Sequence, residues 1–253
     1  MNRCIVSVGA GSWYPRGIRR LRDTLRNVGY SGGRMLWEND LPPGCPTHHD
    51  SPYAFKTYAL TMAVMRGDQT LLWCDASTWF LRDPAPIFEW VERHGYYLWR
   101  NPCEDLGAYA ADHTLDVMNV DREESFTVPM VVSTIFGVST RVAPGPEILT
   151  RLVSAAKRGA FNAPWVNDPS GQSWHPGMRA ACGSPDSRVK GCRHDQAALS
   201  CIAYKMGLNL DERSPSELIG YPSMPHSSDV IALAEDDGGA SIDAWEQDGW
   251  LKT

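Results

Sequence analysis

Residues 70–84 read TLLWCDASTWFLRDP, an apolar run that ends at an aspartate and is followed by a turn. The apolar run from Leu71 to Cys74 carries no charge and stops at Asp75. A short run of this kind between two turn signals is typical of a buried strand in a parallel sheet. Ligands of such sheets bind just outside the carboxyl ends of the strands. Asp75 is therefore placed to hold a polar ligand, such as a cation with a bound phosphate, unless it only caps the following turn.

The composition predicts one soluble globular domain with a sizeable core, because 43% of the 253 residues are hydrophobic and 21% are charged. No apolar run approaches the ~20 residues of a membrane span. The apolar stretch at the N-terminus is too short for a signal peptide, so a cytoplasmic location is expected. Seven scattered cysteines without CxxC spacing argue against a disulfide framework and against a structural zinc site. The adjacent histidines His48 and His49 point in different directions and make a weak metal pair.

The net charge is −6, but positive charge is concentrated in two segments. Residues 1–34 carry seven basic residues against Asp23 alone, and residues 141–193 carry eight against three acids. Such segments can hold the phosphates of a nucleotide or of a polymer. Solvated protein faces give the same counts, so both interpretations stay open. The chain after residue 207 is acidic.

Strands and helices are predicted to alternate along the chain. The expected strands cover 4–8, 34–37, 71–74, 96–99 and 128–138, and the expected helices cover 15–28, 53–65, 83–94, 146–158 and 195–206. Residues 103–124 are expected to be mostly helical. Residues 159–193 form a long irregular segment with Trp165 and Trp174, which is a candidate acceptor-binding or lid segment. This alternation predicts an α/β fold with a largely parallel central sheet flanked by helices.

Three segments together resemble the nucleotide-sugar-dependent glycosyltransferases of the GT-A fold. The segment Asp75-Ala76-Ser77 resembles the DxD motif that follows a strand of that family. Tyr53-Ala54-Phe55-Lys56 is similar to the family's F-K-P helix, and His194-Asp195-Gln196 is similar to its H-D-Q segment. The resemblance implies a single Rossmann-like GT-A domain over residues 1–206. Residues 207–253 are expected to be a C-terminal extension that wraps the same domain.

The resemblance also implies which residues bind the donor, and the expected donor is a UDP-sugar. The implied donor-binding residues are Val8, Gly9, Ala10, Lys56, Asp75, Ala76, Ser77, His194 and Gln196. A leaving diphosphate is commonly neutralised by Mn²⁺ or Mg²⁺ held by carboxylates. The implied metal ligands are Asp75, Ser77 and His226. Ser77 departs from the motif, because a hydroxyl stands where the family has a second acid.

Asp195 is the expected catalytic residue, and three roles compete for it. It can cap the helix that begins there. It can take the proton of the acceptor hydroxyl, which an inverting transfer needs. It can instead orient the acceptor or the sugar in a retaining transfer. Lys56 has two interpretations as well, because it can neutralise diphosphate charge or extend along the apolar surface of its helix.

The resemblance thus implies a metal-dependent glycosyltransferase that moves a sugar from a nucleotide-sugar donor to an acceptor hydroxyl. The acceptor is expected to be a glycan or polysaccharide, or a hydroxymethylated base in viral DNA. Two alternatives stay open. The first is a catalytically silent module that binds a nucleotide sugar or a glycan, which Ser77 suggests. The second is a nucleotidyltransferase, although that class needs a glycine- and lysine-rich N-terminal loop that Gly9 to Pro15 does not show.

Overall fold

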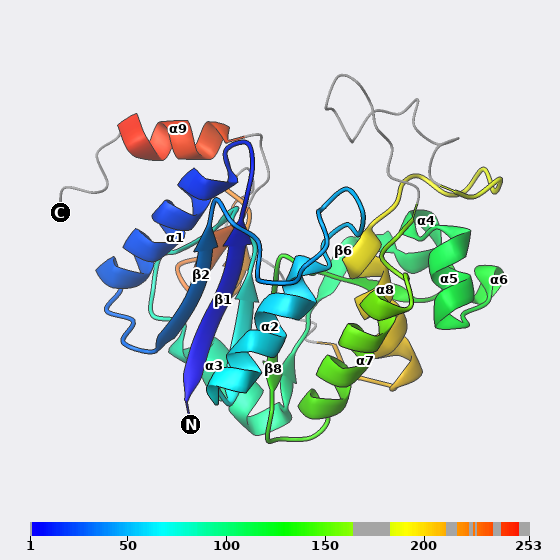
Figure 1. Ribbon diagram of the computed structural model, residues 1–253, viewed down its shortest axis with the longest axis horizontal. Coiled ribbons are helices and arrows are strands. Elements are labelled where there is room, and N and C mark those ends of the chain that lie inside the picture. Colours follow the sequence, from blue (N-terminus) through cyan, green and yellow to red (C-terminus); the bar gives the residue numbers. More distant parts are fainter. Residues whose placement is uncertain are drawn as a thin grey trace.

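The computed structural model describes residues 2–163, 183–210, 217–222, 225, 227–234 and 239–247 (Figure 1). For Cys103 and residues 244–247 only the backbone is described. None of the described helices is long and apolar enough to cross a membrane. Among the described cysteines, Cys4, Cys45, Cys74 and Cys201 are free thiols.

The centre of the molecule is a five-stranded sheet. Its strands are β1 (Arg3–Gly9), β2 (Gly33–Glu38), β3 (Thr70–Cys74), β5 (Tyr96–Tyr97) and β8 (Ile135–Ser139), in the order β2-β1-β3-β8-β5. The pairs β1–β2 and β1–β3 are parallel, whereas β8 runs antiparallel to both of its neighbours. All five residues of β3 are buried, as expected for a strand covered on both faces. The expectation of a mostly parallel α/β sheet is confirmed.

Helices cover both faces of this sheet. One face packs against α1 (Tyr14–Asn27) and α3 (Ala85–His94), and the other packs against α2 (Phe55–Arg66), α7 (Gly145–Lys157) and α8 (His194–Lys205). Figure 1 shows α1 on one side of β1 and β2, and α2, α7 and α8 on the other. The helix α9 (Ala240–Gln247) lies against α1.

Smaller elements surround the central sheet. Strand β4 (Thr78–Phe80) directly follows the Asp75 turn and pairs antiparallel with β10 (Ala232–Ala234), which pairs with β9 (Ile219–Gly220). A hairpin of β6 (Arg100–Asp105) and β7 (Pro129–Val131) encloses three short helices, α4 (Leu106–Tyr109), α5 (Asp112–Met118) and α6 (Arg122–Ser125). Part of the segment after residue 207 thus adds two strands to the sheet that contains β4, and one helix beside α1.

One prediction about secondary structure is wrong in detail. The run 128–138 is not one strand, because it divides into β7 and β8, which belong to different sheets. Residues 132–134 leave the strand pattern between them, and the carbonyl of Thr134 accepts a hydrogen bond of 2.8 Å from the amide of Asp75. Residues 103–124 are mostly helical, as expected, although residues 103–105 still belong to strand β6. High β propensity marks both halves of 128–138 equally, so it does not reveal the break.

Helix α1 contacts the Asp75 turn closely because one residue of the helix is glycine. A Cβ atom at Gly17 would lie 2.1 Å from the carbonyl oxygen of Ala76. Any larger residue at this position would therefore displace the turn or the helix. Gly17 thus fixes the depth at which residues 75–77 sit against α1.

Candidate functional site

The candidate site lies at the carboxyl edge of β1 and β3. In the parallel register of these strands Val6 is opposite Trp73, so residues 8–10 and residues 75–77 leave the sheet at the same edge. The Val8 side chain is buried in the core, while Gly9 ends β1. This is the edge at which open α/β sheets bind ligands. The structure thus brings together two segments that are more than sixty residues apart in the sequence.

Lys56 lies at the centre of the site, one residue after the start of α2. Its side chain is 2% exposed, and its Nζ atom lies 2.9 Å from Asp75 Oδ1 and 2.9 Å from Asp195 Oδ2. Nζ also donates a hydrogen bond of 3.1 Å to the carbonyl of Ser133. An ammonium group has three N–H donors, and here each of them has an acceptor. Lys56 therefore does not extend to the surface of its helix.

The charge of Lys56 is stabilised by the two carboxylates. Burial disfavours the ammonium form, but the charges of Asp195 and Asp75, together with hydrogen bonds to both, outweigh it and raise the pKa of Lys56. The rings of Tyr53 and Trp73 also face the ammonium, each with its centroid 5.3 Å from Nζ. Lys56 is thus a fixed positive charge within the site.

Asp75 does not cap the turn with its side chain. Its Oδ1 atom accepts from Lys56 and also from the indole Nε1 of Trp73 at 2.6 Å. The side chain remains 27% exposed, so the second oxygen is left for a ligand. Burial raises the pKa of Asp75, and the nearby charge of Asp195 adds to this, whereas the Lys56 ammonium opposes it. Between the two readings of the sequence, the geometry favours a ligand-binding carboxylate.

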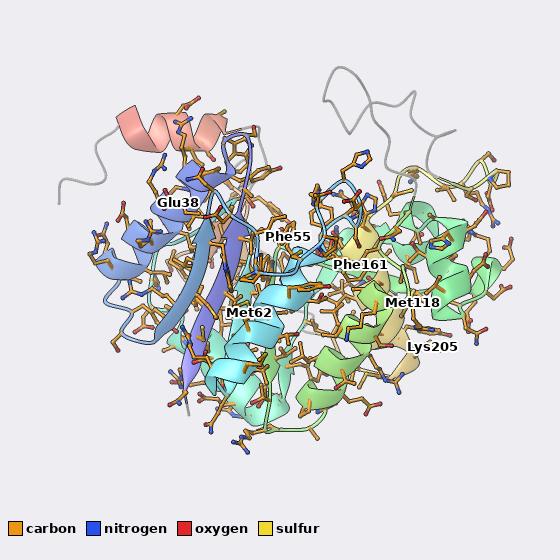
Figure 2. All side chains as sticks on the ribbon, viewed as in Figure 1. Glu38, Phe55, Met62, Met118, Phe161 and Lys205 are labelled. Atoms are coloured by element: carbon orange, nitrogen blue, oxygen red, sulfur yellow. The ribbon has the colours of Figure 1, made fainter. Side chains whose placement is uncertain are left out.

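Asp195 is the second residue of α8 and does not occupy its N-cap position. The N-cap is Arg193, which makes no side-chain capping bond. The Asp195 side chain is 9% exposed and turns toward Lys56. The structure thus joins residues 56, 75 and 195 in one cluster with a net formal charge of −1. Figure 2 labels Phe55 and Phe161 near this end of α2 and α8, and Met62 and Lys205 farther along the same helices.

The neighbours of Asp195 face different partners. The ring Nδ1 of His194 lies 3.0 Å from the carbonyl oxygen of Phe161, and burial lowers the pKa of His194. The Nε2 amide of Gln196 points toward Glu104 at 3.5 Å, and Arg193 forms an ion pair of 2.6 Å with the same carboxylate. His194 and Gln196 thus flank Asp195 in the sequence, and each already has a partner within the protein.

His48 belongs to an aromatic wall next to the cluster. Its ring contacts Tyr53 edge to face with centroids 4.7 Å apart, and Tyr53 in turn lies 5.8 Å from the ring of His194. The Nδ1 atom of His48 accepts a hydrogen bond of 3.2 Å from the amide of Tyr53. Burial, followed by the charge of His194, lowers the pKa of His48 to about 4. His49 is 72% exposed and turned toward Asp50, so the two histidines do not form a metal pair.

The described residues do not fit a divalent metal. Ser77 is 4% exposed and Asp75 already shares one oxygen with Lys56 and Trp73, which leaves a single free carboxylate oxygen at the turn. Among the described residues no group of three His, Cys, Asp or Glu side chains is placed to hold a metal ion. His226, the third expected ligand, lies outside the described residues, as do Trp165 and Trp174.

Some residues of the site were not predicted from the sequence. Trp73 was expected in a strand, but its indole bond to Asp75 depends on the turn that follows. The carbonyl of Ser133 accepts a hydrogen bond from Lys56, and the carbonyl of Thr134 accepts one from the amide of Asp75. A pattern of side chains does not predict which backbone carbonyl acts as an acceptor. Glu104 accepts hydrogen bonds from Arg193 and Gln196, which are about ninety residues away in the sequence.

A cavity of about 180 Å³ lies elsewhere, and its lining includes Met118, Arg151, Arg158 and Lys205. Lys205 is the last residue of α8, whereas Asp195 is near its start. At 1.5 Å per residue the two are about 15 Å apart along the helix. The cavity is therefore separate from the carboxylate cluster, and the chemistry of the cluster makes it the better candidate site.

Comparison with known proteins adds evidence about the fold. No family model matches the chain, and no curated protein matches it either. Its structure is similar to that of a glycosyltransferase involved in the glycosylation of the major capsid of PBCV-1, with a TM-score of 0.52. The two sequences are 13% identical, and the match covers 97% of this chain and 100% of that chain. The two proteins share a fold.

Proposed function

We propose that this protein is a glycosyltransferase that moves a sugar from a nucleotide-sugar donor to an acceptor hydroxyl. The observation that carries the proposal is the cluster of Asp75, Lys56 and Asp195 at the carboxyl edge of the sheet. The shared fold with a glycosyltransferase supports it. Fold alone does not determine chemistry, so the roles below rest on the cluster.

In this proposal each carboxylate uses its free oxygen. Asp75 accepts a hydrogen bond from a hydroxyl of the donor, while residues 8–10 at the end of β1 line the nucleoside. The acceptor oxygen forms a bond to the anomeric carbon as the bond from that carbon to the diphosphate oxygen breaks. The diphosphate leaves with the bonding electrons, and Asp195 takes the proton of the acceptor hydroxyl. A carboxylate in this position is a suitable general base.

We propose a UDP-sugar as the donor and a glycan hydroxyl as the acceptor. A hydroxymethylated base in DNA is the second candidate, and the basic segments of the chain suggested it. The structure gives many of these basic residues carboxylate partners within the protein, which favours the glycan. Arg19 and Arg22, for example, both pair with Glu38, and Arg188 pairs with Glu123 and Asp186.

The experiment that tests the proposal measures nucleoside diphosphate release from a panel of UDP-, GDP- and dTDP-sugars. Release from at least one donor, increased by an oligosaccharide acceptor, supports it. Donor binding without release indicates the silent binding module that Ser77 suggested. Pyrophosphate release from a nucleoside triphosphate and a sugar phosphate indicates a nucleotidyltransferase. Either of the last two results contradicts the proposed function.

A further inference from the structure

The Asp75–Ser77 turn is bound by two buried cations of the protein itself. Lys56, 2% exposed, contacts the Asp75 carboxylate, and Arg20, 0% exposed, donates a hydrogen bond of 3.0 Å to the carbonyl of Ser77. The Arg20 guanidinium also lies over the ring of Trp79, 3.9 Å from its centroid. The two cations come from different helices, Arg20 from α1 and Lys56 from α2.

These contacts use one oxygen of Asp75 and leave a single free carboxylate oxygen at the turn for a metal ion. The Lys56 ammonium lies 2.9 Å from one oxygen of Asp75, so a divalent ion on the other oxygen would lie within a few ångströms of a like charge. Hard cations such as Mg²⁺ take oxygen ligands, usually one or two carboxylates together with waters and substrate phosphates. At this turn Asp75 is already paired with Lys56. Ser77, a neutral hydroxyl, stands where the DxD motif has its second acid.

We infer that the Lys56 ammonium is the resident cation of this site, and that sugar transfer proceeds without a protein-bound divalent metal. This inference concerns the site of the proposed function and deepens it. Lys56 acts here as a positioning residue, because all three of its donors are used within the protein. It fixes the positions of the Asp75 and Asp195 carboxylates relative to each other and offsets one of their two negative charges. Each carboxylate keeps one oxygen that is not bound to Lys56.

The test has a binding arm that does not depend on turnover. The EDTA-treated and desalted wild-type protein is titrated with Mn²⁺ while electron paramagnetic resonance follows the free ion. We expect no stoichiometric uptake by the wild type or by Lys56→Arg, which keeps the charge. We expect uptake by Lys56→Met, because two neighbouring carboxylates then lack their counter-ion. One equivalent of Mn²⁺ bound by the wild type and lost in Asp75→Asn would overturn the inference, whether or not Lys56→Met folds.

The second arm uses the donor that the panel identifies. If no metal takes part, EDTA should change the turnover of the wild type by less than about twofold. A factor of two corresponds to a negligible change in the activation barrier. Loss of turnover with EDTA that Mn²⁺ restores would contradict the inference. If no donor turns over with or without Mn²⁺, the proposed function fails, and the binding arm still decides whether Lys56 excludes the metal.

Discussion

At the scale of single residues, the account depends on two carboxylates with different surroundings. Asp75 is 27% exposed and faces outward, whereas Asp195 is 9% exposed and lies deeper, with Lys56 between them. Such an arrangement suits two different tasks on one substrate. The outer carboxylate suits the binding of a hydroxyl, and the inner one suits the transfer of a proton.

Replacement of Asp195 tests the second task. Asp195→Asn keeps the size and a hydrogen-bond acceptor for Lys56 but removes the base, so we expect kcat to fall about 10²- to 10⁴-fold. The donor KM should change much less, because donor contacts are assigned to Asp75. Steady-state release of nucleoside diphosphate measures both constants. Glu147→Gln, which alters an exposed ion pair on α7, is the matched control. If Asp195→Asn is as active as this control, Asp195 is not the general base.

His48 makes the stability of the site depend on pH. Its folded-state pKa of about 4 lies below the ordinary value of 6.5, so the neutral ring is favoured by folding. The stability that results is present above pH 6.5 and is lost as the pH falls toward 4. We expect the free energy of unfolding, measured with urea at a series of pH values, to decrease through this window.

The variant His48→Asn should weaken this pH dependence, because it keeps an acceptor for the Tyr53 amide but does not titrate. A part of the dependence should remain, since burial also lowers the pKa of His194. His49→Asn is the control, because that ring is 72% exposed. Identical pH profiles for wild type and His48→Asn would show that His48 does not have the buried neutral state described above.

At the scale of elements, the site depends on how α1 meets the turn after β3. Gly17→Ala places a methyl group 2.1 Å from the Ala76 carbonyl oxygen, and overpacking of this kind costs about 1–3 kcal/mol. We expect a lower free energy of unfolding and a higher donor KM, because the turn that carries Asp75 must shift. Urea denaturation and steady-state kinetics measure the two effects.

Gly191→Ala is the matched control for Gly17→Ala. A Cβ atom at Gly191 meets Tyr109 at 3.5 Å, which is an ordinary contact. The control should therefore leave stability near the wild-type value. Equal effects of the two substitutions would contradict the close approach of α1 and the turn.

Elements with a regular period could be predicted from the sequence, and the connections that complete the site could not. Burial of a strand or of one helix face produces a regular apolar pattern in the sequence. The run before Asp75 and the apolar face of α1 are two such patterns. The division of 128–138 into β7 and β8 does not, because it depends on pairing with two separate sheets. The same break supplies the carbonyl groups that hold Lys56 and Asp75.

Two carboxylates of the candidate site could be named from the sequence, but their geometry could not. Asp75 and Asp195 were both named from their segments, but no local pattern shows that one lysine bridges them. Lys56 was expected to face the diphosphate or to extend to the surface. Its three acceptors come from the turn after β3, from the segment between β7 and β8, and from α8, so only the assembled fold reveals its position.

At the scale of the whole molecule, the distribution of charge bears on the acceptor. The arginines of residues 1–34 that pair with carboxylates are Arg3 with Glu92, Arg16 with Asp243, Arg19 and Arg22 with Glu38, and Arg26 with Asp23. The net charge is −6. Binding to DNA depends on free cations that displace counter-ions from phosphates.

We therefore expect weak affinity for duplex DNA. Fluorescence anisotropy of a labelled duplex, with and without hydroxymethylated bases, should show no salt-dependent binding at protein concentrations in the micromolar range. A charge-neutral labelled oligosaccharide is the comparison ligand. Tight binding that falls steeply with added salt would instead support DNA as the acceptor.

The central claim is that the donor binds at the carboxylate cluster, and a structure of the protein with a bound nucleotide sugar tests it most directly. The account predicts a sugar hydroxyl within about 3.2 Å of the free oxygen of Asp75. It predicts the anomeric carbon on the side of Asp195 and the nucleoside beside residues 8–10. A donor bound in the basic cavity near Lys205, with the cluster left without ligand contacts, would contradict the account.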